Sequence, residues 1–583
     1  MRRLVVAAGV LAVCIAAGYL LLQKESPLAH GVHYASHMQK EFYGDMAAAD
    51  TVRTTGTEGA IVSHHLLMAD DIARTFASMA SEEVRTVVII GPDHFTRNEG
   101  QASISRYAYD TPWGRVEPDL EVIDRITEER LANPEEYVFE IEHSISSLVP
   151  FVKYHFPNAK LVPIVLQRNT SAASSDAIAE HLRKNLPEDS IVIASVDFSH
   201  HLSVTAADFH DAKSIETVRA FDYPSLARLE VDSPASLRTV LKYLESKGAM
   251  RPTKFENTNS SRFLGIPDSD DVTSYLFATF AKGPKEGSGA LSILAIGDAM
   301  LGRDVAKKHA QGTDLFERFR GVEGNFLKGF DIFIANLEGP ITTASRCQEK
   351  SIVFSFEPDM ARYLKGNAIT HVNLSNNHTF DCFTEGLVDT KRYLADAGIR
   401  HVGGGSLTES TRTETINGTS IAILGLDRTI QPVAAEAVYA HIRSLEEEHA
   451  YTVIEVHWGI EYDKAESSDQ RDLAHGMIDS GADAVIGHHP HVVQPVEIYK
   501  NRPIFYSLGN FIFDQIGIEM NTGIAAGLVF EKEATGIFLF PYRLNARYQP
   551  ALMDYDEAQA YCSALDIRGT RDDQDKCVLR IMR

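Results

Sequence analysis

The chain has 583 residues and a formal net charge of −24, with 44% hydrophobic and 23% charged residues. This length predicts more than one domain, and the composition is typical of globular protein and excludes a largely disordered chain. The acidic balance argues against a nucleic-acid partner, because phosphate backbones attract basic proteins. It also means that an anionic ligand would need a local cation, such as a metal ion, to offset the negative field.

The N-terminus has the pattern of a membrane anchor. Arg2 and Arg3 precede an uncharged run, Leu4–Leu22, which is long enough to span a bilayer core. The arginines favour a cytoplasmic N-terminus, and a cleaved signal would have a shorter apolar core. Cys14 weakly suggests lipoprotein processing, although Val13 is bulky for such a site. We expect an uncleaved anchor at residues 1–25 in the cell membrane, with the rest of the chain periplasmic or extracellular.

Four cysteines follow the predicted anchor. An extracytoplasmic location favours disulfide bonds, and Cys347, Cys382, Cys562 and Cys577 allow two of them. We favour the pairing that is local in sequence, Cys562 with Cys577. The connectivity stays open, because spacing alone does not decide it.

Short apolar strands alternate with helices in the first predicted domain, residues 26–282. We expect a helix at 67–79 and strands at 60–62, 85–90, 161–166, 191–194 and 274–280. Continuous β-branched strands of this kind predict a mainly parallel sheet covered on both faces, and thus an α/β fold. Ligands bind outside the carboxyl ends of such strands. The polar residues just past these ends are His64, His94, Asp197 and His200.

Four motifs in this domain are similar to those of the Memo family: Ser63–His64–His65, Gly91–Pro92–Asp93–His94, Glu142–His143–Ser144–Ile145 and Asp197–Phe198–Ser199–His200. The resemblance implies a fold like that of class III extradiol dioxygenases and one redox-active metal. It places ligands at His64, His94 and His200, with Asp197 orienting a ligand or acting on a proton. His143 would line the pocket. This donor set suits iron, copper or zinc. Some family members have a cysteine near the position of Asn257–Asn259, which this chain lacks.

A polar linker at 283–290 leads to a second predicted domain, residues 291–545, followed by a tail at 546–583 that we interpret as a cap closed by a disulfide bond. The predicted helices of the second domain are 385–397 and 468–480. Its predicted strands are 291–296, 331–335, 371–375, 452–456, 484–486 and 503–507. Polar side chains follow each strand end: Asp298, Glu338, Asn377–His378, His457, His489–His491 and Asn510. Such carboxylate, amide and imidazole ligands suit two divalent cations.

The richest of these strand ends is Ala482–Pro495. Gly487 ends a buried strand, and His488, His489 and His491 follow it. In an extended loop alternate side chains point the same way, so His489 and His491 would face one point. The pattern predicts a metal or phosphate-type site. The alternative is a polar surface turn that happens to contain histidines.

These stretches resemble the CapA family, the poly-γ-glutamate capsule synthesis proteins. The motifs are Gly297–Asp298, Asn336–Leu337–Glu338–Gly339, Asn376–Asn377–His378, Val456–His457–Trp458–Gly459, His489–Pro490–His491 and Ser507–Leu508–Gly509–Asn510–Phe511. The resemblance implies a fold like that of the calcineurin-type metallophosphoesterases, an α/β sandwich. One departure is that Asp298–Ala299–Met300 lacks the histidine of the usual Asp–x–His motif.

The resemblance and the ligands together predict a hydrolase-like centre with two divalent metals, Mn, Zn or Fe, held by Asp298, Glu338, Asn377, His378, His457, His489 and His491. His378 would also stabilise or protonate a leaving group. The expected partners are an anionic capsule or envelope polymer, the membrane and a polymer synthase complex. One alternative is a non-enzymatic surface that passes polymer outward. Another is a Memo-like redox metalloenzyme in which the second domain only binds polymer.

Overall fold

The computed structural model describes residues 31–47, 54–266, 269–430, 433–569 and 575–582. The predicted anchor, Leu4–Leu22, lies outside these residues. Within them, no helix combines the length and apolar character needed to cross a bilayer. The chain divides into a first unit (Met1–Val196, Ala235–Phe255 and Phe277–Pro284) and a second unit (Asp197–Pro234, Glu256–Leu276 and Lys285–Arg583). Two second-unit segments thus come from the span predicted for the first domain, whose boundaries at 282 and 291 stay predictions.

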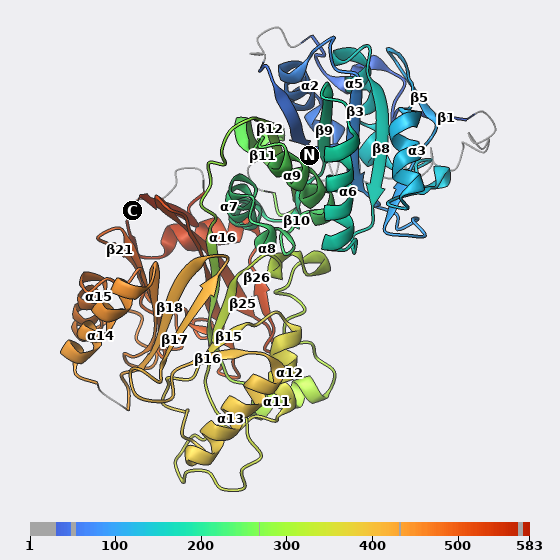
Figure 1. The fold of residues 1–583 in the computed structure, drawn as a ribbon. Helices are drawn as coiled ribbons and strands as arrows, with labels where there is room; N and C mark the ends of the chain where they lie inside the picture. Colours follow the sequence, from blue (N-terminus) through green and yellow to red (C-terminus); the bar gives the residue numbers. More distant parts are fainter. Residues whose placement is uncertain (1–30, 48–53, 267–268, 431–432, 570–574, 583) are drawn as a thin grey trace, which may run out of the picture. The chain divides into compact units, whose positions relative to one another are not determined.

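A largely parallel sheet forms the centre of the first unit (Figure 1). Its strands run in the order β2-β9-β3-β8-β4-β7, and residues 278–281 of β12 pair antiparallel with β2. The bounds are β2 Thr57–Val62, β3 Thr86–Pro92, β4 Ala102–Ile104, β7 Asn133–Pro134, β8 Lys160–Leu166, β9 Ser190–Ser195 and β12 Val272–Ala281. The three central pairs, β2 with β9, β9 with β3 and β3 with β8, are parallel. The predicted parallel sheet is therefore confirmed.

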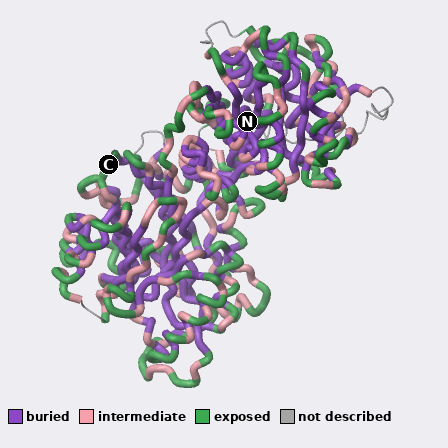
Figure 2. The backbone as a smooth tube through the Cα atoms, in the orientation of Figure 1, coloured by how far each residue is buried: buried purple, intermediate pink, exposed green. Residues whose placement is uncertain are grey.

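Helices bury the faces of this sheet, because its central strands carry apolar side chains in both directions. Phe76 on α2 packs against Phe151 on α5, with ring centroids 5.6 Å apart. The tube coloured by burial shows the strands as buried and the helix exteriors as exposed (Figure 2). The helices are α2 Ala69–Met79, α3 Leu120–Glu128, α4 His143–Ser146, α5 Val149–His155, α6 Ala172–Asn185 and α9 Pro234–Ser246, and a small separate sheet has β1 Val32–Tyr34, β5 Ala108–Thr111 and β6 Gly114–Val116.

Two sheets stack face to face in the second unit. The first has the order β16-β15-β14-β13-β24-β25-β26, with β23 beside β13 and β28 beside β25; the second has the order β17-β18-β19-β20-β22-β21-β27. Ile293, Ile334 and Leu528 of the first sheet share one buried cluster with Ile423 and Ile486 of the second. The first sheet comprises β13 Leu291–Ala299, β14 Ile332–Leu337, β15 His371–Asn373, β16 Arg400–Val402, β23 Asn510–Ile512, β24 Thr522–Phe530, β25 Ala534–Leu544, β26 Pro550–Leu552 and β28 Val578–Met582. The second comprises β17 Thr411–Ile416, β18 Thr419–Asp427, β19 Tyr451–His457, β20 Ala484–His488, β21 Val496–Tyr499, β22 Arg502–Phe505 and β27 Ile567–Arg568.

Helices cover the outer faces of both sheets, which makes four layers. Leu364 and Leu394 pack on the first sheet around Phe333, whereas Val438 and Met477 pack on the second sheet. The helices are α7 Val204–Ala220, α11 Arg303–Ala310, α12 Asp359–Gly366, α13 Phe383–Ala397, α14 Ala435–Glu448, α15 Ser468–Asp479 and α16 Tyr555–Ala564. The predicted α/β sandwich is thus present as two β layers between helices. The shorter elements of this unit include β10 Phe198–Leu202, α8 Tyr223–Leu226 and α10 Ser260–Leu264.

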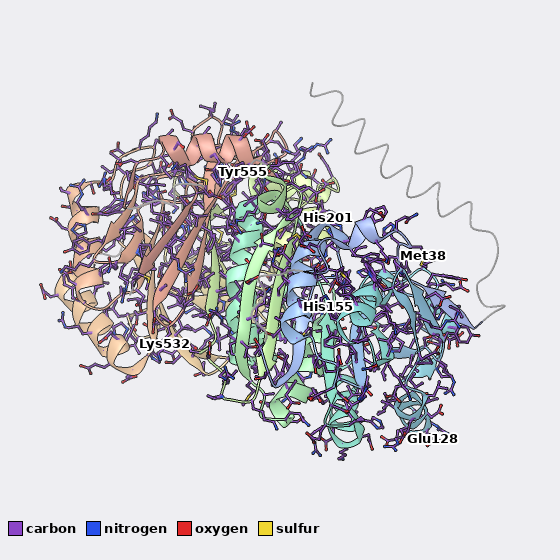
Figure 3. All side chains as sticks on the ribbon, turned by 90° about the horizontal axis from the view of Figure 1, so that it is seen from above. Met38, Glu128, His155, His201, Lys532 and Tyr555 are labelled. Carbon is purple, nitrogen blue, oxygen red and sulfur yellow. A yellow bond between two sulfur atoms is a disulfide. The ribbon has the colours of Figure 1, made fainter. Side chains whose placement is uncertain are left out.

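The C-terminal segment closes one edge of this sandwich. Figure 3 marks Tyr555 at the start of α16 and Lys532 in the turn between β24 and β25. Cys562 on α16 is bonded to Cys577, as predicted, and a second disulfide joins Cys347 to Cys382. Both bonds lie within the second unit.

Candidate metal centre

Strand register aligns the polar residues of the second unit at one edge. Asp298 on β13 is paired with Asn336 on β14 and with Asn510 on β23. In the second sheet, His457 at the end of β19 lies opposite His488 at the end of β20. The close approach requires glycine, because a Cβ on Gly297 would lie 1.9 Å from the carbonyl oxygen of Gly509. Parallel strands thus bring residues that are distant in sequence to a common edge, as predicted.

Asp298, Glu338 and His491 form the centre of the cluster. All three are buried, and each offers a ligand atom within 4.8 Å of the others. His491 Nδ1 lies 3.0 Å from Asp298 Oδ2 and 3.0 Å from Asn510 Oδ1, so that this nitrogen acts as a donor. His491 Nε2 lies 3.7 Å from Glu338 Oε1. No described residue donates a hydrogen bond to either oxygen of Glu338.

The electrostatics of this group depend on its burial. Burial raises the pKa of Glu338 well above its usual value and Asp298 adds to this, although His491 opposes it. For Asp298, burial acts in the same direction, but the hydrogen bond and charge of His491 outweigh it and lower the pKa. Burial disfavours the charged form of His491, yet Glu338 and Asp298 raise its pKa to about 9. A proton on His491 therefore supplies the positive charge that a cation would otherwise supply.

His457 and His489 lie on the second-sheet side of the cluster, with ring centroids 4.7 Å apart. His457 Nε2 lies 2.9 Å from Asn377 Oδ1, and its Nδ1 lies 3.3 Å from Asn336 Nδ2, a pattern that is satisfied when Nε2 carries the proton. Burial lowers the pKa of His457 well below 6.5 and, with the charge of His491, lowers that of His489 to about 4. Both imidazoles are therefore neutral at pH 7, which is the form that binds metals.

The histidine loop after β20 differs from the extended loop expected from the sequence. His489 has φ 100° and His491 has φ 59°, so both residues are in the left-handed region. The alternation argument is therefore wrong, although the two rings still lie 5.9 Å apart. Positive φ values at non-glycine residues cost free energy and persist only where the surroundings impose them. Nδ1 of His489, which is 8% exposed, has no hydrogen-bond partner among the described residues.

His378 lies at the edge of the cluster and is held by a segment that the sequence did not single out. Its Nδ1 lies 2.7 Å from Asp381 Oδ2 and its Nε2 lies 3.9 Å from Glu338 Oε1. Burial lowers the pKa of His378, although Asp381 opposes this shift. Asp381, fully buried, also forms an ion pair with Lys350 at 2.5 Å. The carboxylate fixes the ring orientation and leaves Nε2 facing Glu338.

The segment 347–354, which we call the strap, holds Asp381 in place. The backbone N–H of Phe354 donates to Asp381 Oδ2 at 2.6 Å, and that of Gln348 donates to the Asp381 carbonyl at 2.7 Å. The Phe354 ring packs on His378, with centroids 4.0 Å apart. The disulfide Cys347–Cys382 fastens the strap next to Asp381.

A small cavity of about 30 Å³ opens beside the same loops. Its lining includes Asn376, Gly404, Gly405 and Asp427. Asn376 is the chain neighbour of Asn377, a predicted ligand.

The first unit contains a second, smaller histidine cluster. His64, His94 and His143 offer nitrogens within 4.8 Å of one another. The His94 and His143 rings stack, with centroids 4.2 Å apart. Glu142 Oε1 lies 2.8 Å from His94 Nδ1, and its Oε2 accepts from the His94 backbone at 2.9 Å. Burial would raise the pKa of Glu142, but the bonds from His94 outweigh it and lower the pKa to about 2.

Two predicted residues of the Memo-like motifs, Asp197 and His200, belong to the second unit. The backbone N–H of Asp197 donates to Asp232 at 2.9 Å, and that of His200 donates to Glu230 at 2.8 Å. Their roles as a catalytic residue and a ligand stay predictions. His143, expected only to line the pocket, is the residue that the first unit places beside His64 and His94.

Sequence reasoning missed several residues of the second-unit centre. Asn336 donates to Asp298 at 2.8 Å, Asp381 orients His378, and Glu461 lies with His489 and His491. Asp381 lies three residues after His378 and Glu461 lies four residues after His457, and that proximity was the available signal.

Comparison with known proteins gives two non-overlapping matches. The family "Bacterial capsule synthesis protein PGA_cap" matches residues 292–515, and "Memo-like protein" matches residues 48–255. The PGA biosynthesis protein CapA of Bacillus subtilis is 32% identical over 307 residues, covering 48% of this chain and 80% of that protein. A MEMO1 family protein of Sulfurisphaera tokodaii is 30% identical over 220 residues, covering 36% of this chain and 76% of that protein. A MEMO1 family protein of Pyrobaculum aerophilum is 36% identical over 143 residues, covering 24% of this chain and 50% of that protein.

Proposed function

Because the chain belongs to the CapA family of capsule synthesis proteins in its second part and to the Memo family in its first, we propose that the second unit is a metal-dependent centre with hydrolase-like chemistry. Its substrate is an anionic capsule or envelope polymer, poly-γ-glutamate or a similar carboxylate polymer. The polymer is inferred from the names of the relatives, and the hydrolase-like chemistry is inferred from the geometry of the site.

The observation that carries this proposal is the environment of Glu338. Its carboxylate is fully buried beside Asp298 and has no hydrogen-bond donor among the described residues. A buried carboxylate without partners is costly unless it is protonated or coordinates a cation. Two carboxylates and an imidazole with mutually close ligand atoms are a donor set that fits a divalent cation.

The remaining predicted ligands fit a second cation. Asn377, His457 and His489 contribute an amide oxygen and imidazole nitrogens on the second-sheet side, and His457 and His489 are both buried. Divalent cations bound at such a site supply Lewis acidity and lower the pKa of water. We propose manganese, zinc or iron as the metals.

The chain's own residues then have separate tasks. The cations would offset the negative field locally, within a chain of net charge −24, and so would admit an anionic polymer. Nε2 of His378, facing Glu338, is placed to give a proton to a leaving group or to stabilise it. Asp381 holds the ring for this task through Nδ1.

The test is to incubate the purified protein with poly-γ-glutamate and manganese or zinc and to measure the polymer length. We expect shortening in the wild type and its loss in His378→Ala. Binding without shortening would instead support the second candidate function, a metal-stabilised surface that transfers polymer from a membrane synthase complex outward. Neither binding nor shortening would exclude this polymer as the ligand.

A separate candidate activity belongs to the first unit. The close approach of His64, His94 and His143 favours one iron, copper or zinc ion there. In that case the protein would be a Memo-like redox metalloenzyme whose second unit binds polymer. The test is metal content, with metal-dependent oxygen consumption as a second measurement. We expect His94→Ala to lose one equivalent of metal, and an unchanged metal content would exclude His94 as a ligand.

We also propose that the N-terminal run Leu4–Leu22 anchors the protein in the cell membrane with both units outside the cytoplasm. The support is the uncharged sequence after Arg2 and Arg3. Protease added to cells with a permeabilised outer barrier should digest the protein. Full protection would contradict this location.

A further inference from the structure

The loop between β19 and α15 brings an unassigned carboxylate to the metal centre. Glu461 lies four residues after His457, and its side chain is exposed, unlike the other members of the cluster. One of its oxygens, with one nitrogen each of His489 and His491, forms a group whose atoms all lie within 4.8 Å of one another. His491 also belongs to the Asp298–Glu338 group. The two candidate groups therefore overlap at this imidazole, whose Nδ1 donates to Asp298 and Asn510 and whose Nε2 can bind a cation at one of them.

The backbone fixes this loop against the histidine loop. The N–H of Tyr462 donates to the Pro490 carbonyl at 2.8 Å, between His489 and His491. Gln494 donates to the carbonyls of Asp463 and Ala465 at 2.9 and 3.0 Å. The Tyr462 backbone and the Gln494 side chain thus hold the loop of Glu461 beside the two histidines.

A second observation points to a ligand at this position. Nδ1 of His489 is buried without a hydrogen-bond partner among the described residues, and a buried ring nitrogen in that state lacks a group to bind.

We propose that Glu461 is a metal ligand, supplying a carboxylate oxygen to the cation held by His489 and His491. This inference rests on the proposed metal centre and extends it. With Asp298, Glu338 and Glu461 the centre has three carboxylates, and oxygen-rich sets favour manganese relative to zinc, whereas imidazole favours zinc. The exposure of Glu461 places this cation on the side open to substrate.

The experiment is a metal titration of the full chain, purified free of metal, in a His94→Ala background that removes the first-unit cluster. Binding of Mn²⁺ is followed by electron paramagnetic resonance, and affinity for Zn²⁺ by competition with a chromogenic chelator. We expect Glu461→Gln to weaken Mn²⁺ binding at one of two positions by at least about tenfold. Glu461→His should shift the ratio of the two affinities toward zinc.

The matched control is Asp463→Asn, which removes the same charge from the same exposed loop without removing a donor from the cluster. It should bind both metals like the wild type. If Glu461→Gln binds Mn²⁺ within twofold of the wild type, or if Asp463→Asn weakens binding equally, Glu461 is not a ligand. Glu338→Gln separates this outcome from a failure of the centre itself. If Glu338→Gln loses Mn²⁺ binding while Glu461→Gln keeps it, only the assignment of Glu461 as a ligand is wrong. If the wild type binds no Mn²⁺, both the proposed metal centre and the assignment of Glu461 are wrong.

Discussion

The two histidine clusters contain similar side chains, but their carboxylates are in opposite states. In the first unit, Glu142 accepts hydrogen bonds from His94 and from the Ser144 backbone, and its pKa falls to about 2. In the second unit, Glu338 accepts none from described residues, and its pKa rises. Glu142 is thus satisfied by the protein and orients a histidine, whereas Glu338 needs a proton or a cation. Side-chain identity alone does not separate a ligand from an orienting group, but the satisfaction of its oxygens does.

The test of this contrast with the largest expected effect is Glu338→Gln. Because burial disfavours the charged form of Glu338 and raises its pKa when no metal is bound, glutamine should leave the metal-free stability of the second unit nearly unchanged. With Mn²⁺ at one hundred times its Kd, the wild type should gain about 2.7 kcal/mol and the variant little. Urea unfolding of Trp113→Phe proteins, in which only Trp458 of the second unit fluoresces, measures both quantities. An equal gain in the variant would mean that Glu338 is not a ligand.

The converse test is Glu142→Gln in the first unit. Glutamine cannot replace the charged acceptor of His94, so we expect a loss of about 2 kcal/mol whether or not metal is present. Trp113 reports this unit in a Trp458→Phe background. Glu140→Gln, which removes a more exposed carboxylate two residues away, is the control and should change stability little. A loss that appears only with metal would make Glu142 part of a metal site instead.

A third carboxylate, which is half-buried, sharpens the contrast through pH. Glu414 on β17 is 10% exposed and pairs with Arg400, Arg412 and His371. Burial alone would raise its pKa, but these partners lower it to about 2. The folded-state value lies below the usual 4.5, so its stabilisation is present above pH 4.5 and is lost as pH falls toward 2. We expect Glu414→Gln to cost about 1.5 kcal/mol at pH 7 and progressively less in acid. A cost independent of pH would contradict an electrostatic origin.

The repeating order of strands and polar strand ends was predictable, because continuous apolar runs such as those of β3 and β19 have few alternatives. The same pattern placed Asp298, Glu338, His457 and His491 at one edge. The antiparallel pair β24 and β25 was missed, since no ligand motif drew attention to it, although β24 lies beside the central strand β13 of the first sheet. Neighbouring strands in a sheet are set by long-range pairing rather than by local pattern.

The site was less predictable in its supporting residues. Asp381 and Glu461 are common surface residue types, and only the fold shows that one contacts His378 and the other lies with His489 and His491. The conformation of the histidine loop could not be derived either. His489 and His491 have positive φ values, which histidine adopts more often than most non-glycine residues but which remain uncommon, so residue type alone does not predict them.

The disulfide between Cys347 and Cys382 links the geometry of the centre to the chemistry of its surroundings. It fastens the strap that holds Asp381, and through Asp381 it orients His378. Thiols stay reduced in most cytosols and become oxidised after export. If the chain is exported as proposed above, the bond that fastens the strap would form only after export, and His378 would be held loosely before that step.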